Sequence, residues 1–300
     1  MSEHADRYYR PSGRVPFIGT LTMLGLGTLA ALAYGFLYAV VAVYNPIGYA
    51  QVFATIAFGA ALPYTVIDIA HRHKVRHRAF RRLIACVIGG LGIYFSWVWY
   101  IYVLTDWDSR YLIFNPPITF EIIKQLADRG VWSVDGRKPT GFVLYFLWGL
   151  EATFVLVMCY FVNRESDTPF CEECECWTKK MDGLRIAAVE DSVLTQALEE
   201  EEYALIAQQA SQEINLGNYV SLIGYACPKC RETNYLTAST VQLVLGKNGY
   251  EYQIRLFVKP IAVPRDVIEL TQYLYQQAEK AEREANQQIS AQSEPDETTV

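Results

Sequence analysis

The stretch FIGTLTMLGLGTLAALAYGFLYAVVAVY, from Phe17 to Tyr44, contains no charged side chain over 28 residues. A helix of about 20 residues crosses the hydrocarbon core of a bilayer, so this stretch is long enough to span a membrane. A cleaved signal peptide is the alternative, because Ala31 and Ala33 could form a cleavage site. Apolar residues continue beyond that point, however, and sixteen residues precede the stretch, which favours a retained membrane helix.

Three further runs have the same apolar character. They cover residues 47–70, 83–104 and 141–162 and contain 24, 22 and 22 residues. Because an unpaired backbone amide in hydrocarbon costs several kcal/mol, each run is expected to be helical. The sequence therefore predicts an α-helical membrane bundle of four transmembrane helices over residues 17–162, preceded by a cytosolic N-terminal segment at residues 1–16.

The loop between the second and third runs decides the orientation. It reads HRHKVRHRAFRR at residues 71–82 and carries six Lys or Arg side chains in twelve residues. Short basic loops stay on the cytoplasmic side, and an even number of spans then places both termini there, in a plasma or inner membrane. His73 and His77 have a metal-binding spacing, but the surrounding cations disfavour a metal. We expect this loop to contact anionic lipid headgroups instead.

The outer loop at residues 105–140 is too long to be a simple turn. In PPITFEIIKQLADRGVW, the residues Ile118, Ile122 and Leu126 recur at helical spacing and Gly130 follows them. This pattern predicts one short amphipathic helix on the outer surface, capped by Trp132, which either packs as a lid over the bundle or offers a surface to a ligand or partner. Small residues that let helix backbones approach recur at four-residue spacing, at Ala31, Gly35 and Ala39 and again at Ala85 and Gly89.

Glu151 lies at the midpoint of the fourth run, and none of the four runs contains a Lys or Arg to neutralise it. An ionisable group at this depth is costly to bury and marks a candidate functional site. Three roles stay open: a hydrogen bond to a Thr or Tyr of a neighbouring helix, a contact with a partner or a second copy, and movement of protons or ions. Asp68, by contrast, is explained by the adjacent Arg72 and Lys74.

The balance of charge changes sharply at Val162. Up to this residue the chain has 14 Lys and Arg against 9 Asp and Glu, and beyond it 12 against 23. A break of this size indicates a domain boundary. We expect a cytosolic domain at residues 163–275 and a helix end with a disordered polar tail at 276–300. The acidic half is unsuited to nucleic acid, because phosphate contacts need Lys and Arg.

Cysteine spacing carries the strongest chemical signal. Cys171 and Cys174 stand in FCEEC, and Cys227 and Cys230 stand in ACPKC. Two CxxC pairs supply the four thiolates that tetrahedral zinc prefers, so the spacing predicts one structural Zn²⁺. Cys176 could replace Cys171 or Cys174 as a ligand, so the sequence does not decide which two of the first three cysteines bind.

Residues 169–258 resemble a zinc ribbon through these two knuckles, through Trp177 and through the strand-like YVSLIGYAC before the second knuckle. The resemblance implies a small α+β domain that binds zinc. It departs from compact ribbons because 52 residues separate the knuckles, where about 12 to 20 are usual. A helix capped by Ser192 and ended by Gly217 can fill this gap, with an apolar stripe made of Val193, Leu194, Ala197, Leu198 and Leu205.

Two more elements follow the second knuckle. The segment VQLVLGKNGYEYQIRLFV at residues 241–258 alternates on either side of a glycine-bounded turn, which predicts a β-hairpin. A last helix is expected to start near Arg265 and to bury Val267, Leu270 and Leu274.

No GxGxxG, Walker, nucleophile-elbow or HExxH motif occurs, so no catalytic residue is nominated. A redox role for the CxxC pairs is opposed by the reducing cytosol and by the presence of two matched pairs. The leading hypothesis is a membrane scaffold or accessory subunit that presents an acidic, zinc-stabilised domain to a protein partner. A homo-oligomer stays open. The alternatives are a component of a transport system that uses Glu151 and a membrane-bound thiol oxidoreductase.

Overall fold

The computed structural model describes residues 7–45, 48–131, 139–162, 168–246 and 249–292, and the statements below concern these residues. The chain forms two compact units. The helical unit contains residues 12–166, and the sheet unit combines residues 1–11 with residues 167–300. Ile47, Trp132 and the tail at 293–300 lie outside the described residues.

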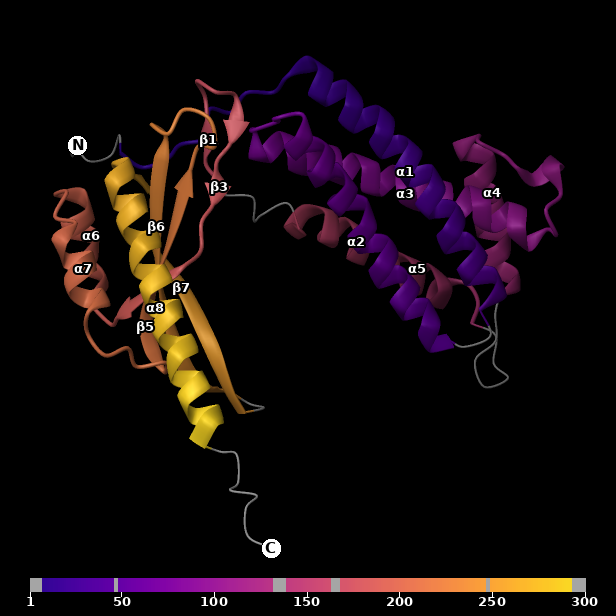
Figure 1. The fold of residues 1–300 in the computed structure, drawn as a ribbon. Coiled ribbons are helices and arrows are strands. Elements are labelled where there is room, and N and C mark those ends of the chain that lie inside the picture. Colours follow the sequence, from indigo (N-terminus) through magenta and orange to yellow (C-terminus); the bar gives the residue numbers. More distant parts are fainter. Residues whose placement is uncertain (1–6, 46–47, 132–138, 163–167, 247–248, 293–300) are drawn as a thin grey trace, which may run out of the picture. The chain divides into compact units, whose positions relative to one another are not determined.

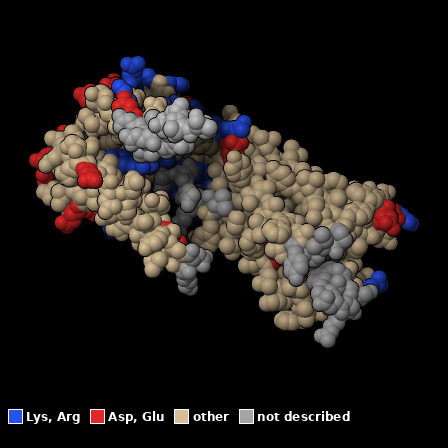
Figure 2. Space-filling view, turned by 60° about the horizontal axis from the view of Figure 1, so that its bottom comes forward, with Lys and Arg blue, Asp and Glu red and all other residues tan. Residues whose placement is uncertain are grey.

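Four helices of the helical unit are long and apolar enough to cross a membrane. They are α1 (Phe17–Tyr44), α2 (Gly48–Arg72), α3 (Arg78–Leu104) and α5 (Phe142–Val162), as drawn in Figure 1. In Figure 2 the surface of this unit is almost wholly tan, and its charged side chains lie near its two ends. The prediction of four long apolar helices is therefore confirmed.

The basic loop is shorter than the sequence suggests, because α3 begins at Arg78 instead of Leu83. The imidazole of His77 caps this helix by accepting a hydrogen bond from the Phe80 amide, with Nδ1 and N 3.0 Å apart. At the end of α2, Arg72 forms an ion pair of 2.8 Å with Asp68, as expected. His73 and His77 therefore do not share a helix, since both lie between α2 and α3.

Small residues allow α1 to approach α3 closely. A Cβ atom on Gly35 would lie 3.0 Å from the backbone nitrogen of Ser96, a distance that real side chains rarely show. The small residues predicted at four-residue spacing are buried. Further buried residues continue the same spacing along α1. The buried stripe on α1 consists of Gly19, Met23, Gly27, Ala31, Gly35 and Ala39, whereas Gly89 of α3 lies against Cys159 of α5.

The outer loop contains the predicted amphipathic helix, α4 (Pro116–Arg129), after the short 3-10 helix η2 (Ser109–Tyr111). Gly130 ends α4 with a positive φ of 73°. The buried face differs from the predicted one, because Ile118 is 47% exposed while Thr119 and Ala127 are buried. Polar contacts hold this side of α4: the Thr119 hydroxyl donates to the carbonyls of Ile113 and Asn115, and the carbonyl of Ala127 accepts a hydrogen bond of 2.8 Å from the Gly141 amide.

The sheet unit is built on one antiparallel sheet. Strands β5 (Asn218–Ala226), β6 (Asn234–Gly246) and β7 (Gly249–Ala262) follow one another, and the short strands β3 (Lys179–Lys180) and β4 (Leu184–Ala187) both pair with β5. The predicted hairpin is confirmed, and Gly246 pairs with Gly249 next to its turn. A separate two-stranded sheet joins β1 (Phe170–Cys171) to β2 (Cys176–Trp177).

Three helices pack on one face of the large sheet and form its core. They are α6 (Asp191–Glu199), α7 (Ala204–Ala210) and α8 (Arg265–Gln292), grouped beside the sheet in Figure 1. A Cβ atom on Gly224 of β5 would lie 3.1 Å from the Ile268 side chain, which places α8 on this face. The fully buried members of this core are Leu184, Ile186, Leu194, Leu198, Ile206, Val220, Leu222, Leu236, Ala238, Val258 and Ile261.

The prediction of a single helix between the knuckles is wrong, because this segment forms two helices, α6 and α7. Four consecutive glutamates at residues 199–202 separate them, and Glu201 has a positive φ of 66°. Crowded like charges disfavour helix, and a left-handed residue ends it. Ser192 is not the N-cap either: Glu190 holds that position, and the Ser192 hydroxyl donates a 2.6 Å hydrogen bond to its carboxylate.

The last helix starts at Arg265 as predicted but continues to Gln292, through a part of the chain that we expected to be a disordered tail. Charged pairs at four-residue spacing extend along it, including Arg265 with Glu269 and Arg283 with Glu279, each at 2.6 Å. Such pairs support a helix that has few apolar residues.

Candidate functional site

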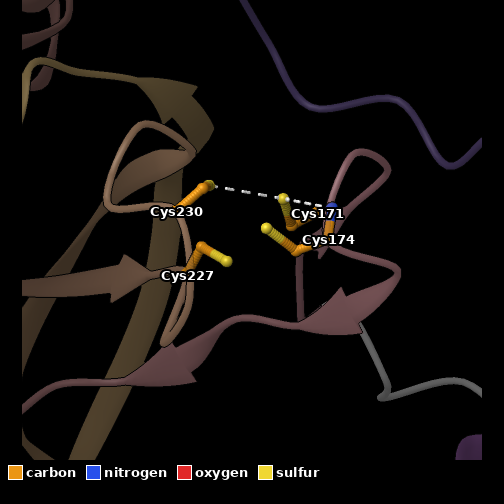
Figure 3. Close-up of side chains that lie close together, drawn as sticks. All are labelled: Cys171, Cys174, Cys227 and Cys230. Atoms are coloured by element: carbon orange, nitrogen blue, oxygen red, sulfur yellow. Dashed lines mark hydrogen bonds between the residues drawn. The ribbon is translucent and has the colours of Figure 1, made fainter.

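Four cysteines come together at one end of the large sheet. Cys171 ends β1 and Cys174 lies in the turn before β2, while Cys227 and Cys230 lie in the turn between β5 and β6. Figure 3 shows the two pairs directed toward a common centre from opposite sides. Their four Sγ atoms all lie within 4.8 Å of one another. The structure thus brings together the four residues named by the CxxC spacing.

The distance between the sulfurs suits a shared metal ion. The Sγ atoms of Cys171 and Cys230 are 3.7 Å apart. A zinc–sulfur bond is about 2.3 Å long, so the edge of a tetrahedron of four sulfurs around zinc is about 3.8 Å. A disulfide would need about 2.05 Å, and all these cysteines are free thiols. The group could therefore hold one metal ion.

The two knuckles have similar but not identical backbone geometry, since the amides that donate to sulfur stand three residues after Cys171 and two residues after Cys227. The amide of Cys174 donates to Cys171 Sγ, and the amide of Lys229 donates to Cys227 Sγ, each over 3.4 Å. The residue after each second cysteine is left-handed, with φ of 48° at Glu175 and 64° at Arg231. This conformation costs a residue with a side chain about 1 kcal/mol or more. The repeated geometry shows that both turns are shaped to direct two sulfurs at one point.

Backbone amides also favour ionised sulfur at the second knuckle. Hydrogen bonds from the amides of Thr233 and Glu232 lower the pKa of Cys230 to about 6. Burial opposes ionisation of Cys227, but the amides of Cys230 and Lys229 outweigh it and lower its pKa as well. At the first knuckle, desolvation and the neighbouring sulfurs raise the pKa of Cys174 to about 12. A bound cation would favour the thiolate of Cys174 as well.

Two further side chains adjoin the cluster. The Sγ atom of Cys176 lies 3.6 Å from that of Cys227, so the fifth thiol, which the sequence left open as a substitute ligand, is within contact of the set. Thr233 was missed by sequence reasoning, and its hydroxyl oxygen lies 3.2 Å from Cys171 Sγ. The CxxC spacing gives no signal for it, since Thr233 lies outside both knuckles.

The N-terminal segment forms part of the sheet unit beside these knuckles. Tyr8 pairs with Ile261 of β7, and the Tyr9 amide donates to the Pro260 carbonyl over 2.8 Å. The Tyr8 hydroxyl donates to Glu199 over 2.7 Å. Burial and this carboxylate raise the pKa of Tyr8 to about 12. Residues 7–9 therefore extend the sheet as a short edge strand, which the sequence did not indicate.

The N-terminal segment also lines a cavity of 390 Å³ next to the first knuckle. Residues 7–10 form one side of it, and Glu172, Glu173 and Tyr235 form others. The rings of Tyr9 and Tyr235 meet edge to face with centroids 5.4 Å apart. Because Arg and Glu side chains both line the cavity, it favours no single sign of charge in a ligand.

Glu151, in the helical unit, accepts hydrogen bonds from two other helices. The Tyr38 hydroxyl of α1 donates to its Oε2 over 3.2 Å, and Thr55 of α2 lies 3.5 Å from its Oε1. Gln51 of α2 in turn donates to the Tyr38 hydroxyl over 2.7 Å. The sequence anticipated a Thr or Tyr partner, and the structure supplies both. Among the described residues, no Lys or Arg forms an ion pair with Glu151.

Compared with known proteins, the chain matches no protein family model, no curated protein and no solved structure.

Proposed function

We propose that this chain is a multi-pass membrane scaffold or accessory subunit whose sheet unit holds a structural zinc ion and presents an acidic surface to a protein partner in the cytosol. The observation that carries the proposal is the cluster of four cysteine sulfurs, all within 4.8 Å of one another. Four thiolates fill every position around tetrahedral zinc and leave no site for an activated water. Such an ion stabilises a domain and performs no hydrolysis.

The arrangement of the chain ends supports the proposed topology. Residues 7–9 precede the first long helix and pair with β7, which follows the last one. This pairing supports a topology in which both flanks of the helical unit lie on one side of the membrane, as they do after an even number of crossings. The six cations of residues 71–82 favour the cytoplasmic side.

The surface of α6 and α7 is the strongest candidate for a partner contact. Of the four glutamates at residues 199–202, Glu199 ends α6 and the other three lie between α6 and α7, where Glu200 and Glu202 are exposed. A partner with a basic surface would be steered to such a patch and oriented by it.

Charge reversal tests this proposal on the intact chain. The double variant Glu200→Lys and Glu202→Lys is expected to lose the bound partner by at least several-fold when complexes are purified in mild detergent and identified by mass spectrometry, because rim charges control association. The matched control is Glu282→Lys with Glu284→Lys, which makes the same charge change on exposed positions of α8. Equal partner recovery from both variants, or no partner with the native chain, would refute the proposal.

A role in transport is the second candidate, and the polar groups around Glu151 favour it. Tyr38, Gln51 and Thr55 converge on this carboxyl from two helices, as a site for proton or ion passage requires. The thiol oxidoreductase has less support, because the two CxxC pairs face each other around one centre, as the ligands of a shared ion do.

Two substitutions separate a structural Glu151 from a transporting one. Glu151→Gln keeps the shape and most hydrogen bonds, so we expect unchanged resistance to unfolding in detergent. Glu151→Leu removes interhelical bonds worth on average about 0.6 kcal/mol each and is expected to lower that resistance. The Glu151→Gln variant can also fold normally and keep the purified complex intact but lose activity in cells. In that case proton or ion movement becomes the leading function.

A further inference from the structure

The large sheet has one face covered by helices and one that carries exposed apolar side chains. On β6, Leu236 and Ala238 belong to the core beneath α6, α7 and α8. Side chains alternate along a strand, so the odd-numbered positions of β6 and their partners on β7 lie on the opposite face. The pairing of Leu245 with Tyr250 and of Leu243 with Tyr252 sets these residues side by side there.

The apolar stripe, as we name it, is formed by six large residues of this second face. Their exposed fractions range from 39% to 76%. Two cross-strand pairs make it continuous between β6 and β7. Large exposed apolar patches mark binding surfaces. The stripe consists of Leu243, Leu245, Tyr250, Tyr252, Ile254 and Leu256.

Charge is distributed unequally between the two faces. Arg185 pairs with Ser221 and Lys180 pairs with Tyr225, so both cations lie on the face of the stripe. Among the described strand residues assigned to this face by register, none is Asp or Glu. The acidic residues 199–202 lie with α6 and α7 on the other face. The strand residues of this sheet face thus combine apolar, tyrosine and cationic groups without anions.

We infer that the apolar stripe docks on the lipid surface of the membrane that the chain's own helices cross. Tyrosine places its apolar ring among acyl chains and its hydroxyl among headgroups. Arg185 and Lys180 complement the negative charge of cytoplasmic lipids. The tethers are short, since α5 ends at Val162 and β1 begins at Phe170. A membrane is therefore always within reach at high effective concentration.

This inference rests on the proposed membrane insertion and extends it. With the stripe against lipid, the acidic helices on the opposite face are directed away from the anionic surface and toward the cytosol. A second copy of the chain, or a soluble protein, is the competing occupant of the stripe, and the experiment below identifies whichever is present.

Photo-crosslinking in the full-length chain tests the inference. Tyr252→p-benzoylphenylalanine is placed on the stripe, and Gln253→p-benzoylphenylalanine, the next residue of β7 and also exposed, is the matched control on the other face. Leu29, 61% exposed on α1, carries the same probe as a test of membrane insertion. The chain is held in nanodiscs of phosphatidylcholine and phosphatidylglycerol, and its adducts are identified by mass spectrometry.

We expect lipid adducts at positions 29 and 252. The yield of lipid adducts should be several-fold higher at 252 than at 253, and the yield at 252 should fall when Arg185→Ala is added. Lipid adducts at 29 without any at 252 would overturn the docking while leaving membrane insertion intact. A crosslink from 252 to a second copy or to a protein would overturn it in favour of that occupant. Absence of lipid adducts at both 29 and 252 would overturn membrane insertion and the docking with it.

Discussion

Removing the proposed metal ion from the purified chain with a strong chelator is expected to release the two knuckles while the large sheet stays folded. The core of that sheet includes Leu222 and Ile268 but none of the cysteines, so its burial does not depend on the ion. Strands β1 and β2, by contrast, contain two residues each and contribute no side chain to that core. Metal binding supplies the folding free energy of such a site, about 10–16 kcal/mol in isolated zinc-finger peptides.

Hydrogen exchange measures this difference directly. Amides of residues 170–177 and 227–233 should lose protection by orders of magnitude after chelation, whereas those at the centre of β5 should keep theirs. Cys227→Ser should reproduce the effect and lower the metal content from one ion per chain. Cys86→Ser is the matched control, since this thiol lies in the helical unit. A metal-free preparation with unchanged protection, or a Cys227–Cys230 disulfide in cells, would contradict the metal assignment.

Replacing Gly35 by leucine is expected to prevent assembly of the helical unit. A Cβ atom at this position would meet the backbone of Ser96 at 3.0 Å and that of Phe95 at 3.2 Å, and backbone cannot rotate away as a side chain can. Overpacking a core commonly costs about 1–3 kcal/mol, and a contact with backbone lies at the upper end of that range. Loss of the monodisperse species in detergent and a lower midpoint of thermal unfolding would report the effect.

Gly25→Leu is the matched control for this substitution. It lies on the same helix, and a Cβ atom there has no neighbour within 4 Å. The same side chain is therefore added to an open surface, and the variant should assemble like the native chain. If both glycine variants assemble equally well, α1 does not approach α3 in the described manner.

The sequence predicts best where one strong local rule acts. The run from Phe17 to Tyr44 is a helix with those same bounds, because length and hydropathy leave no alternative in lipid. The hairpin of β6 and β7 follows from alternation and two glycines. Helix boundaries that are set by polar groups are harder to predict from sequence. The helix α3 begins earlier than predicted because His77 caps it, and α6 ends where four glutamates follow one another.

Contacts between distant parts of the chain could not be predicted. Nothing in the residues around Tyr8 indicates that β7 is its partner, since a strand of three residues has no periodicity to detect. The cysteine set was accessible because CxxC spacing encodes its geometry, whereas Thr233 depends on how the turn after Cys230 folds back. For Glu151, the kind of partner was predictable from chemistry, but the choice of Tyr38 and Thr55 required the packing of three helices.

The pairing of Tyr8 with Ile261 has a consequence for biosynthesis. In the proposed topology of four membrane crossings, the ribosome makes the N-terminal strand first and its partner only after all four long helices have emerged. Until β7 has been synthesised, residues 7–9 have no strand to pair with. They remain in the compartment that received them. A nascent chain that misses one crossing delivers β7 to the opposite compartment, where the strand cannot be completed. Completion of this sheet edge therefore acts as a check that insertion produced an even number of crossings.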